Sequence, residues 1–424
     1  MRFIHTADWH LGNTMHGIER AQEQREFLDW LKFQICEQKA DALVVAGDIF
    51  DVANPSNEAK SIYFSFLASV VNTGCKNIII VGGNHDSASL LDAPKDVLDF
   101  LNIQVVGSII DRNEEELVRE MFNSEGEAIG VCAMIPFIKE NELRKYEAEE
   151  DQGCFADRTH KKLYQTIAEI AEAKRNGRNI PILATGHLYA SQLEGRPQND
   201  TGEGMQNHGV RDIVGNLGTV SVSVFPKQLD YVALGHIHYT TMVAKNPKVR
   251  YSGSPFVLGF DEASIPRHIL LVDSEKGEDP IVCAIDVPQY FNFVRVEGSD
   301  EQIRNTLIEL KLSSDAAKTK IEIVYEFVYG RSIRDTMSDI IDGAAFEVVS
   351  WKTKRHSDLS ARDFADESIE NIRDYDEKDI FEKFILSCMN KKEKDDDAEK
   401  ILAEIMPMFE TLSKEVDEDD TLGK

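Results

Sequence analysis

Short apolar runs of strand length recur along the first 270 residues, and each is followed by a polar loop and then by a helical pattern. The clearest helical patterns cover residues 19–38 and 56–74, where Ser56 and Gly74 occupy positions suited to an N-cap and a C-cap. Strands that alternate with helices predict an α/β fold with helices on the sheet faces. The strand-like runs occupy residues 2–6, 42–46, 77–81, 181–185 and 231–234.

The pattern changes after residue 272, where a second group of strand-like runs and helical patterns begins. Ser299 and Gln302 form the signature of a capping box at the start of one of these helices. We therefore expect a small α+β domain over residues 288–356, separate from a first domain over residues 1–275. Its strand-like runs lie at 293–297, 320–327 and 346–351, and its helical patterns at 299–311 and 332–342.

A highly charged segment follows, and its apolar periodicity predicts two helices, at residues 369–389 and 398–416, in a C-terminal unit over residues 360–416. Each helix would carry a broad apolar stripe. One interpretation is that the stripes pack on this chain's own body. We favour a partner-binding surface, because the stripes follow two domains that look complete. Pro407 predicts a kink or an early end in the second helix.

Composition and charge narrow the possible functions. The 424 residues are 42% hydrophobic and 29% charged, which permits a sizeable core. The formal net charge of −28 disfavours a protein that holds nucleic acid by bulk positive charge alone. A local nucleic-acid site remains compatible with this charge if bound metal ions or a partner supply the positive charge.

The sequence also predicts the cellular compartment of the protein. The six cysteines are scattered without a CxxC pair, which is typical of reduced thiols. Asp8 and His10 stand where a secretory signal would have its apolar stretch, and every apolar run is too short to cross a bilayer. We therefore expect a cytoplasmic protein without a membrane segment.

Five short polar motifs, each directly after a strand-like run, carry the candidate chemistry. A single Gly-His at a strand end is usually structural, but five motifs in this arrangement are specific. Ligands of open α/β sheets gather at the carboxyl ends of strands, so these side chains are expected at one edge. The motifs are Asp8-x-His10, Gly47-Asp48-x-x-Asp51, Gly83-Asn84-His85-Asp86, Gly186-His187 and Gly235-His236-x-His238.

This mixture of side chains suits a pair of divalent ions. Imidazole with carboxylate and amide oxygens is a ligand set for Mn, Fe or Zn. Two ions about 3.5–4 Å apart can hold both the attacking and the leaving oxygen of a phosphate ester. Asp48 is the natural bridge between them, and the glycines before the ligands permit tight turns. The pattern predicts a two-metal site for phosphoester hydrolysis.

The motifs resemble those of the calcineurin-like metallophosphoesterase superfamily, whose fold is a two-sheet β-sandwich flanked by helices. Within it, they resemble the bacterial branch of the nucleases that repair DNA double-strand breaks. The resemblance is strong over residues 1–275 and only architectural beyond them. The stretches that carry it are residues 6–12, 46–51, 83–87, 184–188, 233–238, 251–255 and 260–262.

The resemblance implies a role for each motif residue. His85 would face the phosphate, stabilising the transition state or protonating the leaving oxygen, and Asp51 would pair with His85 and orient it. The implied cofactors are two Mn²⁺ ions, with other divalent transition metals possible. One ion would be held by Asp8, His10, Asp48 and His238, and the other by Asp48, Asn84, His187 and His236.

The resemblance also implies an activity and partners. It implies a Mn-dependent exonuclease on double-stranded DNA and endonuclease on single strands and hairpins, acting in DNA repair, recombination and replication. It further implies a homodimer joined to an SMC-like ATPase of the SbcC type. Lys352, Lys354 and Arg355, at the end of the small domain's last strand, are candidate contacts to DNA phosphate; a solvated surface is the alternative.

Two alternatives share the same core. A phosphatase or phosphodiesterase acting on a small substrate is disfavoured, because such an enzyme has no evident use for the long segment after residue 275. A non-catalytic scaffold of the same fold is disfavoured because the complete ligand set and His85 are present.

Overall fold

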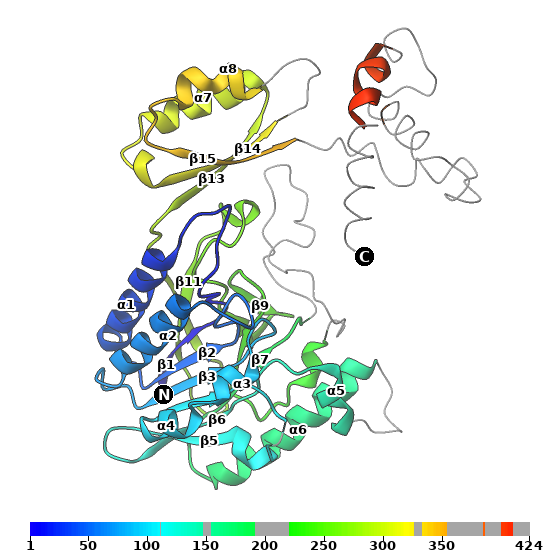
Figure 1. Ribbon diagram of the computed structural model, residues 1–424. Coiled ribbons are helices and arrows are strands. Elements are labelled where there is room, and N and C mark those ends of the chain that lie inside the picture. Colours follow the sequence, from blue (N-terminus) through cyan, green and yellow to red (C-terminus); the bar gives the residue numbers. More distant parts are fainter. Residues whose placement is uncertain are drawn as a thin grey trace, which may run out of the picture. The chain divides into compact units, whose positions relative to one another are not determined.

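The computed structural model describes residues 1–110, 112–146, 154–190, 220–325, 333–353, 385 and 400–409 (Figure 1). The chain divides into two compact units. Met1–Val324 and Ser332–Trp351 form the first, and Tyr325–Arg331 and Lys352–Lys424 form the second. The first unit contains two six-stranded sheets and one three-stranded sheet.

The first large sheet has the strand order β12-β11-β1-β2-β3-β4. Strands β1 to β4 are parallel, and β11 and β12 add antiparallel strands at one side. The continuous apolar runs of the sequence form its central strands, because parallel strands are buried on both faces. The strands are β1 (Arg2–Thr6), β2 (Ala42–Ala46), β3 (Asn77–Val81), β4 (Ile103–Val106), β11 (His268–Asp273) and β12 (Ile281–Asp286).

The second large sheet has the strand order β5-β6-β7-β8-β10-β9. Strands β6, β7, β8 and β10 are parallel, and the two edge strands β5 and β9 are antiparallel to their neighbours. The strands are β5 (Val118–Phe122), β6 (Ala128–Ala133), β7 (Ile182–His187), β8 (Tyr231–Gly235), β9 (Thr241–Val243) and β10 (Asn246–Tyr251).

The two sheets pack face to face. Val44 of β2 lies in one buried cluster with Leu183 of β7 and Val232 of β8. The next residue of β2, Val45, points to the opposite face and packs in a second cluster with Leu31 of a flanking helix. This alternation buries both faces of the first sheet. The predicted fold class, a β-sandwich flanked by helices, is confirmed.

The helices cover the outer faces of the sandwich (Figure 1). The helix predicted over 19–38 forms as α1 (Ala21–Glu37), and Ser56 caps α2 (Asn57–Val70) by accepting a hydrogen bond from the Ala59 amide at 3.1 Å. The remaining helices of this part are α3 (Ala88–Asp92), α4 (Lys95–Phe100), α5 (Glu140–Leu143) and α6 (Phe155–Arg175), with 3₁₀ turns η1 (Glu114–Leu117), η2 (Arg144–Tyr146), η3 (Val222–Val224) and η4 (Phe260–Glu262).

The small α+β region consists of the sheet β13-β14-β15 with helices α7 and α8 on one face (Figure 1). The capping box of Ser299 and Gln302 is present at the start of α7. Phe293 of β13 contacts the Phe260 ring, with ring centroids 5.7 Å apart. The bounds 288–356 stay a prediction. The elements are β13 (Asn292–Gly298), α7 (Asp300–Lys311), η5 (Ala316–Lys318), β14 (Thr319–Tyr325), α8 (Ile333–Ile341) and β15 (Glu347–Thr353).

Several predictions for the C-terminal region lie outside the described residues. These include nearly all of the helix predicted at 369–389, together with Lys354 and Arg355. Residues 400–409 are helical, and Pro407 lies within this stretch, so the helix does not end before the proline. Among the residues that the structure describes, no helix combines the length and the apolar character needed to span a bilayer.

Candidate metal centre

The five motifs lie at the carboxyl ends of β1, β2, β3, β7 and β8, with Gly186 and His187 as the last two residues of β7, and the packing of the two sheets brings these strand ends together. Hydrogen bonds join the loops directly. The His10 amide donates to the Asp48 carbonyl at 2.9 Å, and the His85 amide donates to Asp48 Oδ1 at 2.9 Å. Across the two sheets, the His236 amide donates to Asp8 Oδ1 at 2.8 Å. The motif loops therefore form one connected backbone framework.

Four motif residues adopt left-handed backbone conformations. Their φ angles are 54° for Asp8, 44° for His10, 50° for Asp48 and 98° for His236. Such a conformation costs a non-glycine residue about 1–3 kcal/mol and persists only where surrounding contacts enforce it. All four residues are candidate metal ligands, so backbone strain accompanies the formation of the site.

The glycines in the motifs are required by close backbone approach. A Cβ at Gly83 would lie 2.1 Å from Asp48 Oδ1, and one at Gly47 would lie 2.2 Å from His187 Nδ1. At Gly235 it would lie 1.9 Å from the Ala46 carbonyl oxygen. A side chain at any of these positions would displace a candidate ligand or its backbone.

Among the residues that the structure describes, two fully buried groups of donor atoms result, and His10, Asp51 and His85 form a less buried group beside them. Within each group the candidate donor atoms lie within 4.8 Å of one another. Asp48 lies between the two fully buried groups, since its Oδ2 is 3.2 Å from His187 Nε2 and 3.6 Å from His10 Nε2. Asn84 joins the second group, because its Oδ1 lies 3.0 Å from both His187 Nε2 and His236 Nδ1. The fully buried groups are Asp8, His10 and His238, and Asp48, His187 and His236.

Unpaired polar atoms show that this donor set fits cations. Asp8 Oδ2, His10 Nε2 and His236 Nε2 are buried and, within the described part of the chain, have no hydrogen-bond partner. A buried polar atom without a partner carries a desolvation cost of about 1–3 kcal/mol. Divalent cations between the two groups would supply the missing interactions, and the mixture of N and O donors matches transition metals.

The electrostatics favour the metal-binding forms of His10, His236 and Asp48, whereas burial raises the pKa of Asp8 to about 7. Burial lowers the pKa of His10 to about 4 and that of His236 to about 3, so both imidazoles are neutral at pH 7 and keep a lone pair. Burial by itself would raise the pKa of Asp48, but the neighbouring His187 ring outweighs it and holds that pKa well below its usual range. Asp48 therefore remains a carboxylate. In return, and against the effect of burial, Asp48 raises the pKa of His187 to about 9, so this ring must lose a proton before it can bind a cation.

His85 lies beside the two groups and is only partly buried. Its Nδ1 lies 2.8 Å from the backbone carbonyl oxygen of Asp51, an arrangement that places a proton on Nδ1 and leaves Nε2 without a role in this hydrogen bond. The Asp51 carboxylate has its Oδ1 3.0 Å from Asn13 Nδ2 and 3.3 Å from His10 Nδ1, and one of its oxygens lies within 4.8 Å of a ring nitrogen of His85. Asp51 thus contacts His85 through its main chain and His10 through its side chain.

Two acidic residues have positioning contacts that the motif analysis did not assign. The Asp86 carboxylate accepts hydrogen bonds from the amides of Ile49, Phe50 and Gly83 at 2.8–3.0 Å, which ties the β2 loop to the β3 loop. Glu262 Oε1 lies 3.0 Å from His238 Nδ1. The sequence signal for Asp86 was its place in the Gly83 motif. Glu262 lies in the stretch 260–262 that carries part of the family resemblance, but no role was assigned to it there, and no spacing rule connects it to His238, 24 residues away.

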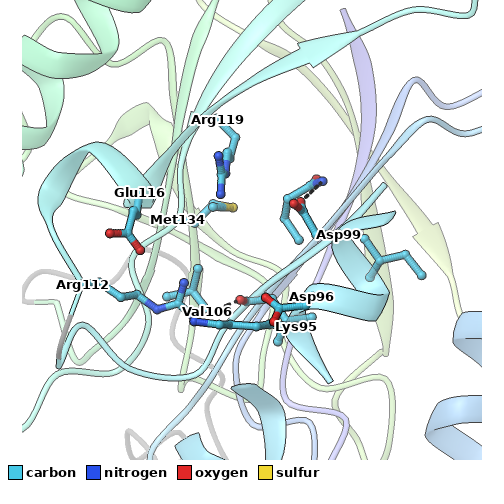
Figure 2. Close-up of a pocket in the computed structure, with 11 residues that line it drawn as sticks. Lys95, Asp96, Asp99, Val106, Arg112, Glu116, Arg119 and Met134 are labelled. Carbon is cyan, nitrogen blue, oxygen red and sulfur yellow. Dashed lines mark hydrogen bonds between the residues drawn. The ribbon is translucent and has the colours of Figure 1, made fainter. Parts of the chain in front are cut away.

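A separate pocket lies away from these residues (Figure 2). It forms between α4, β4 and β5 and contains none of the five motifs. Its charges are mixed, with Arg112, Arg119 and Lys95 beside acidic residues, and Arg112 is already paired with Asp92 at 2.7 Å. The pocket therefore lacks the convergent charge of an anion site. Its acidic lining residues are Asp96, Asp99 and Glu116.

The crowding at Gly83 predicts a large effect of one methyl group. Gly83→Ala should lower the free energy of unfolding by about 3 kcal/mol or more, because the new Cβ overlaps the Asp48 backbone and side chain. Gly126→Ala is the control: its φ is +81°, but an added Cβ meets no atom within 4 Å, so a loss of about 1 kcal/mol is expected. Urea denaturation followed by circular dichroism measures both. Equal losses would contradict the crowding argument.

Comparison with known proteins places this geometry in a family. Residues 1–240 match the calcineurin-like phosphoesterase family. The chain is 34% identical to SbcD of the nuclease SbcCD of Escherichia coli strain K12 over 294 residues, which is 68% of each chain. The SbcD chains of Rhodobacter capsulatus and Bacillus subtilis strain 168 are 32% and 30% identical, over 66% of this chain and 68% of theirs. The chain therefore belongs to the calcineurin-like phosphoesterase family and, within it, to the SbcD proteins, so that it is a metal-dependent phosphodiesterase.

Proposed function

We propose that this protein is a DNA nuclease subunit that hydrolyses phosphodiester bonds with two Mn²⁺ ions. The observation that carries the proposal is the pair of buried donor groups around Asp48, beside a partly exposed His85. The proposed activities are exonuclease action on double-stranded ends and endonuclease action on single strands and hairpins, in DNA repair, recombination and replication. The relatives are named as parts of the nuclease SbcCD, which supports DNA as the substrate.

The ligands are proposed as two sets that share Asp48. Bound in these sets, two divalent ions would supply the positive charge that offsets the developing charge on the phosphate and would lower the pKa of a bound water. This local positive charge reconciles a DNA substrate with a net charge of −28. The first set is Asp8, His10, Asp48 and His238, and the second is Asp48, Asn84, His187 and His236.

His85 is proposed as the general acid. In its protonated form the ring donates Nδ1–H to the Asp51 carbonyl, a contact of 2.8 Å that fixes the ring plane. The Nε2–H is then available to the leaving oxygen, which takes this proton as the P–O bond breaks. Asp51 orients His85 through its main chain, while its carboxylate supports His10.

The relationship to the SbcD proteins also supports a proposal about binding partners. The proposed partner is an SbcC-type ATPase, engaged by the C-terminal region over residues 360–416.

We also propose that the protein is a homodimer in the cytoplasm. An apolar surface at the end of α4 supports the homodimer, since Phe100 is 91% exposed and Val97 67% exposed, and a two-fold axis through this patch would bury it on both copies. Lys352, an exposed residue of β15, is a proposed DNA contact together with Lys354 and Arg355.

An assay with two substrates tests the function. With Mn²⁺, the purified protein should hydrolyse linear duplex DNA and bis-p-nitrophenyl phosphate, and EDTA should abolish both reactions. Hydrolysis of the small diester without DNA cleavage would indicate a small-molecule phosphodiesterase, and inactivity on both would indicate a scaffold. Full activity with Mg²⁺ alone would contradict the metal assignment, because histidine-rich sites suit Mg²⁺ poorly.

Two substitutions distinguish the proposed role of His85 as general acid from the proposed role of Asp48 as metal ligand. His85→Ala should retain two bound Mn²⁺ ions while activity falls about 10²–10⁴-fold, the usual contribution of a positioned proton donor. Asp48→Ala should lose metal and activity together, because Asp48 Oδ2 lies close to His187 and His10, one from each group. Metal content by atomic emission and rates on the small diester measure both effects. Loss of metal from the His85 variant would show that its role is misassigned.

Deletion of residues 360–424 tests the partner surface. The truncated protein should retain Mn²⁺-dependent hydrolysis of bis-p-nitrophenyl phosphate, because both donor groups lie between Asp8 and His238. It should fail to co-purify with SbcC, whereas the full chain should co-purify. Unchanged binding of the ATPase by the truncated protein would exclude this region as the docking surface.

A further inference from the structure

We propose that Glu262, held by Arg267, is a positioning residue that sets the metal affinity of the group formed by Asp8, His10 and His238. The inference deepens the proposed function, since it rests on a cation bound at that group. It concerns metal affinity, which is measurable without any reaction.

The contacts around Glu262 form a closed network. Its Oε1 lies 3.0 Å from His238 Nδ1, and its Oε2 accepts hydrogen bonds from Arg267 Nη2 at 3.0 Å and from the Leu258 amide at 3.2 Å. Arg267 also donates to the His238 carbonyl oxygen at 2.8 Å through Nη1 and to the Glu262 carbonyl oxygen at 2.8 Å through Nη2. The Arg267 guanidinium therefore holds both the Glu262 carboxylate and the main chain of His238, the candidate ligand.

This contact determines which nitrogen of His238 can bind a cation. With Nδ1 donating its proton to Glu262, the Nε2 lone pair is the one left for the group with Asp8 and His10. A carboxylate behind a ligating imidazole fixes the tautomer and the ring orientation and raises the basicity of the ring. Glu262 therefore prepares His238 as a ligand before any ion arrives.

Stability alone does not account for the buried charges. Glu262, Arg267 and His238 are each exposed by only 4%. A buried ion pair gains little net folding stability, since desolvation offsets the attraction, and apolar residues of the same volume would often serve as well. The orientation of both Glu262 oxygens, one toward Arg267 and one toward His238, instead matches a role at the ligand.

The two donor groups differ in the acceptors that face the Nδ1 atoms of their histidines. His187, in the second group, bonds through Nδ1 to the Ala46 backbone carbonyl at 2.9 Å, which is a neutral acceptor. Both histidines of the first group, His10 and His238, instead face carboxylates, from Asp51 at 3.3 Å and from Glu262 at 3.0 Å. Substitution of Glu262 should therefore weaken one metal position and leave the other unchanged.

The loop that carries Glu262 is well anchored. Glu262 ends the 3₁₀ turn η4, where Phe260 packs against the Phe293 ring and lies 5.6 Å from the His16 ring centroid. These apolar contacts hold the turn independently of the carboxylate. A Glu262→Gln substitution, which keeps the shape and one hydrogen-bond acceptor, should thus alter charge and basicity without moving the turn.

The experiment is a Mn²⁺ titration of the full chain after metal removal by a chelator, with free Mn²⁺ followed by electron paramagnetic resonance. In Glu262→Gln, one of two dissociation constants should rise about 10–100-fold, the usual effect of losing such a support, and the other should not change. On bis-p-nitrophenyl phosphate, the Mn²⁺ concentration for half-maximal rate should rise by the same factor, and the rate should recover at saturating Mn²⁺.

A second buried ion pair provides the matched control. Arg20 and Glu23 are both buried and 2.6 Å apart, and Glu23 belongs to neither donor group. Glu23→Gln should leave both Mn²⁺ dissociation constants unchanged, even if the melting temperature falls. Glu262→Asp keeps the charge on a shorter side chain and should restore part of the Mn²⁺ affinity that Glu262→Gln loses. If the Glu262→Gln protein does not fold, Glu262→Asp takes its place in the comparison with wild type.

The outcomes are distinct. Unchanged Mn²⁺ affinity in a folded Glu262→Gln protein would overturn the inference, as would equal weakening by Glu23→Gln. A wild-type protein that binds Mn²⁺ but does not cleave DNA would contradict the proposed function, and the affinity comparison would still decide the role of Glu262.

Discussion

The site depends on one steric constraint: the backbone after β2 must approach the loops after β3 and β8 with no side chain between them. Cβ atoms at Gly83 and Gly235 would lie 2.2 Å or less from atoms of Asp48 and Ala46. This contact places Asp48, from the first sheet, between two groups of histidines. Of these, His10 follows a strand of the first sheet, and His187, His236 and His238 belong to strand ends of the second. If a methyl group at these positions pushed the two sheets apart, the Asp48 carboxylate would no longer lie close to both donor groups.

Main-chain amides donate the hydrogen bonds that join the loops after β1, β2 and β3, while the apolar cluster shared by β2, β7 and β8 holds the two sheets together. Asp86 accepts three amide hydrogen bonds, and the amides of His10 and His85 bond to Asp48. These bonds hold Asp8, His10 and Asp48 in left-handed conformations that carry a cost in free energy. The apolar clusters on either side of the first sheet supply the folding free energy that offsets this cost.

The fold and the main residues of the site were accessible from the sequence because both follow local patterns. Apolar runs predicted the central strands, and the motif after each run placed Asp8, Asp48 and His187 at one edge. The contacts of Asp51 and Glu262 were not accessible. Which atom of Asp51 faces His85 depends on a turn geometry that residue identity does not specify. Glu262 reaches His238 only because the chain folds back through η4.

The unpaired buried atoms of Asp8, His10 and His236 have a consequence for the lifetime of the protein. A cation that binds only the native state adds its binding free energy to folding, about 2.7 kcal/mol when its free concentration is 100 times the dissociation constant. Without the cation, strained turns and unpaired polar atoms remain, and local opening at this edge becomes cheaper. Proteases act on such open states in proportion to their population. A divalent cation bound at these atoms would therefore lengthen the lifetime of the chain in addition to serving its reaction.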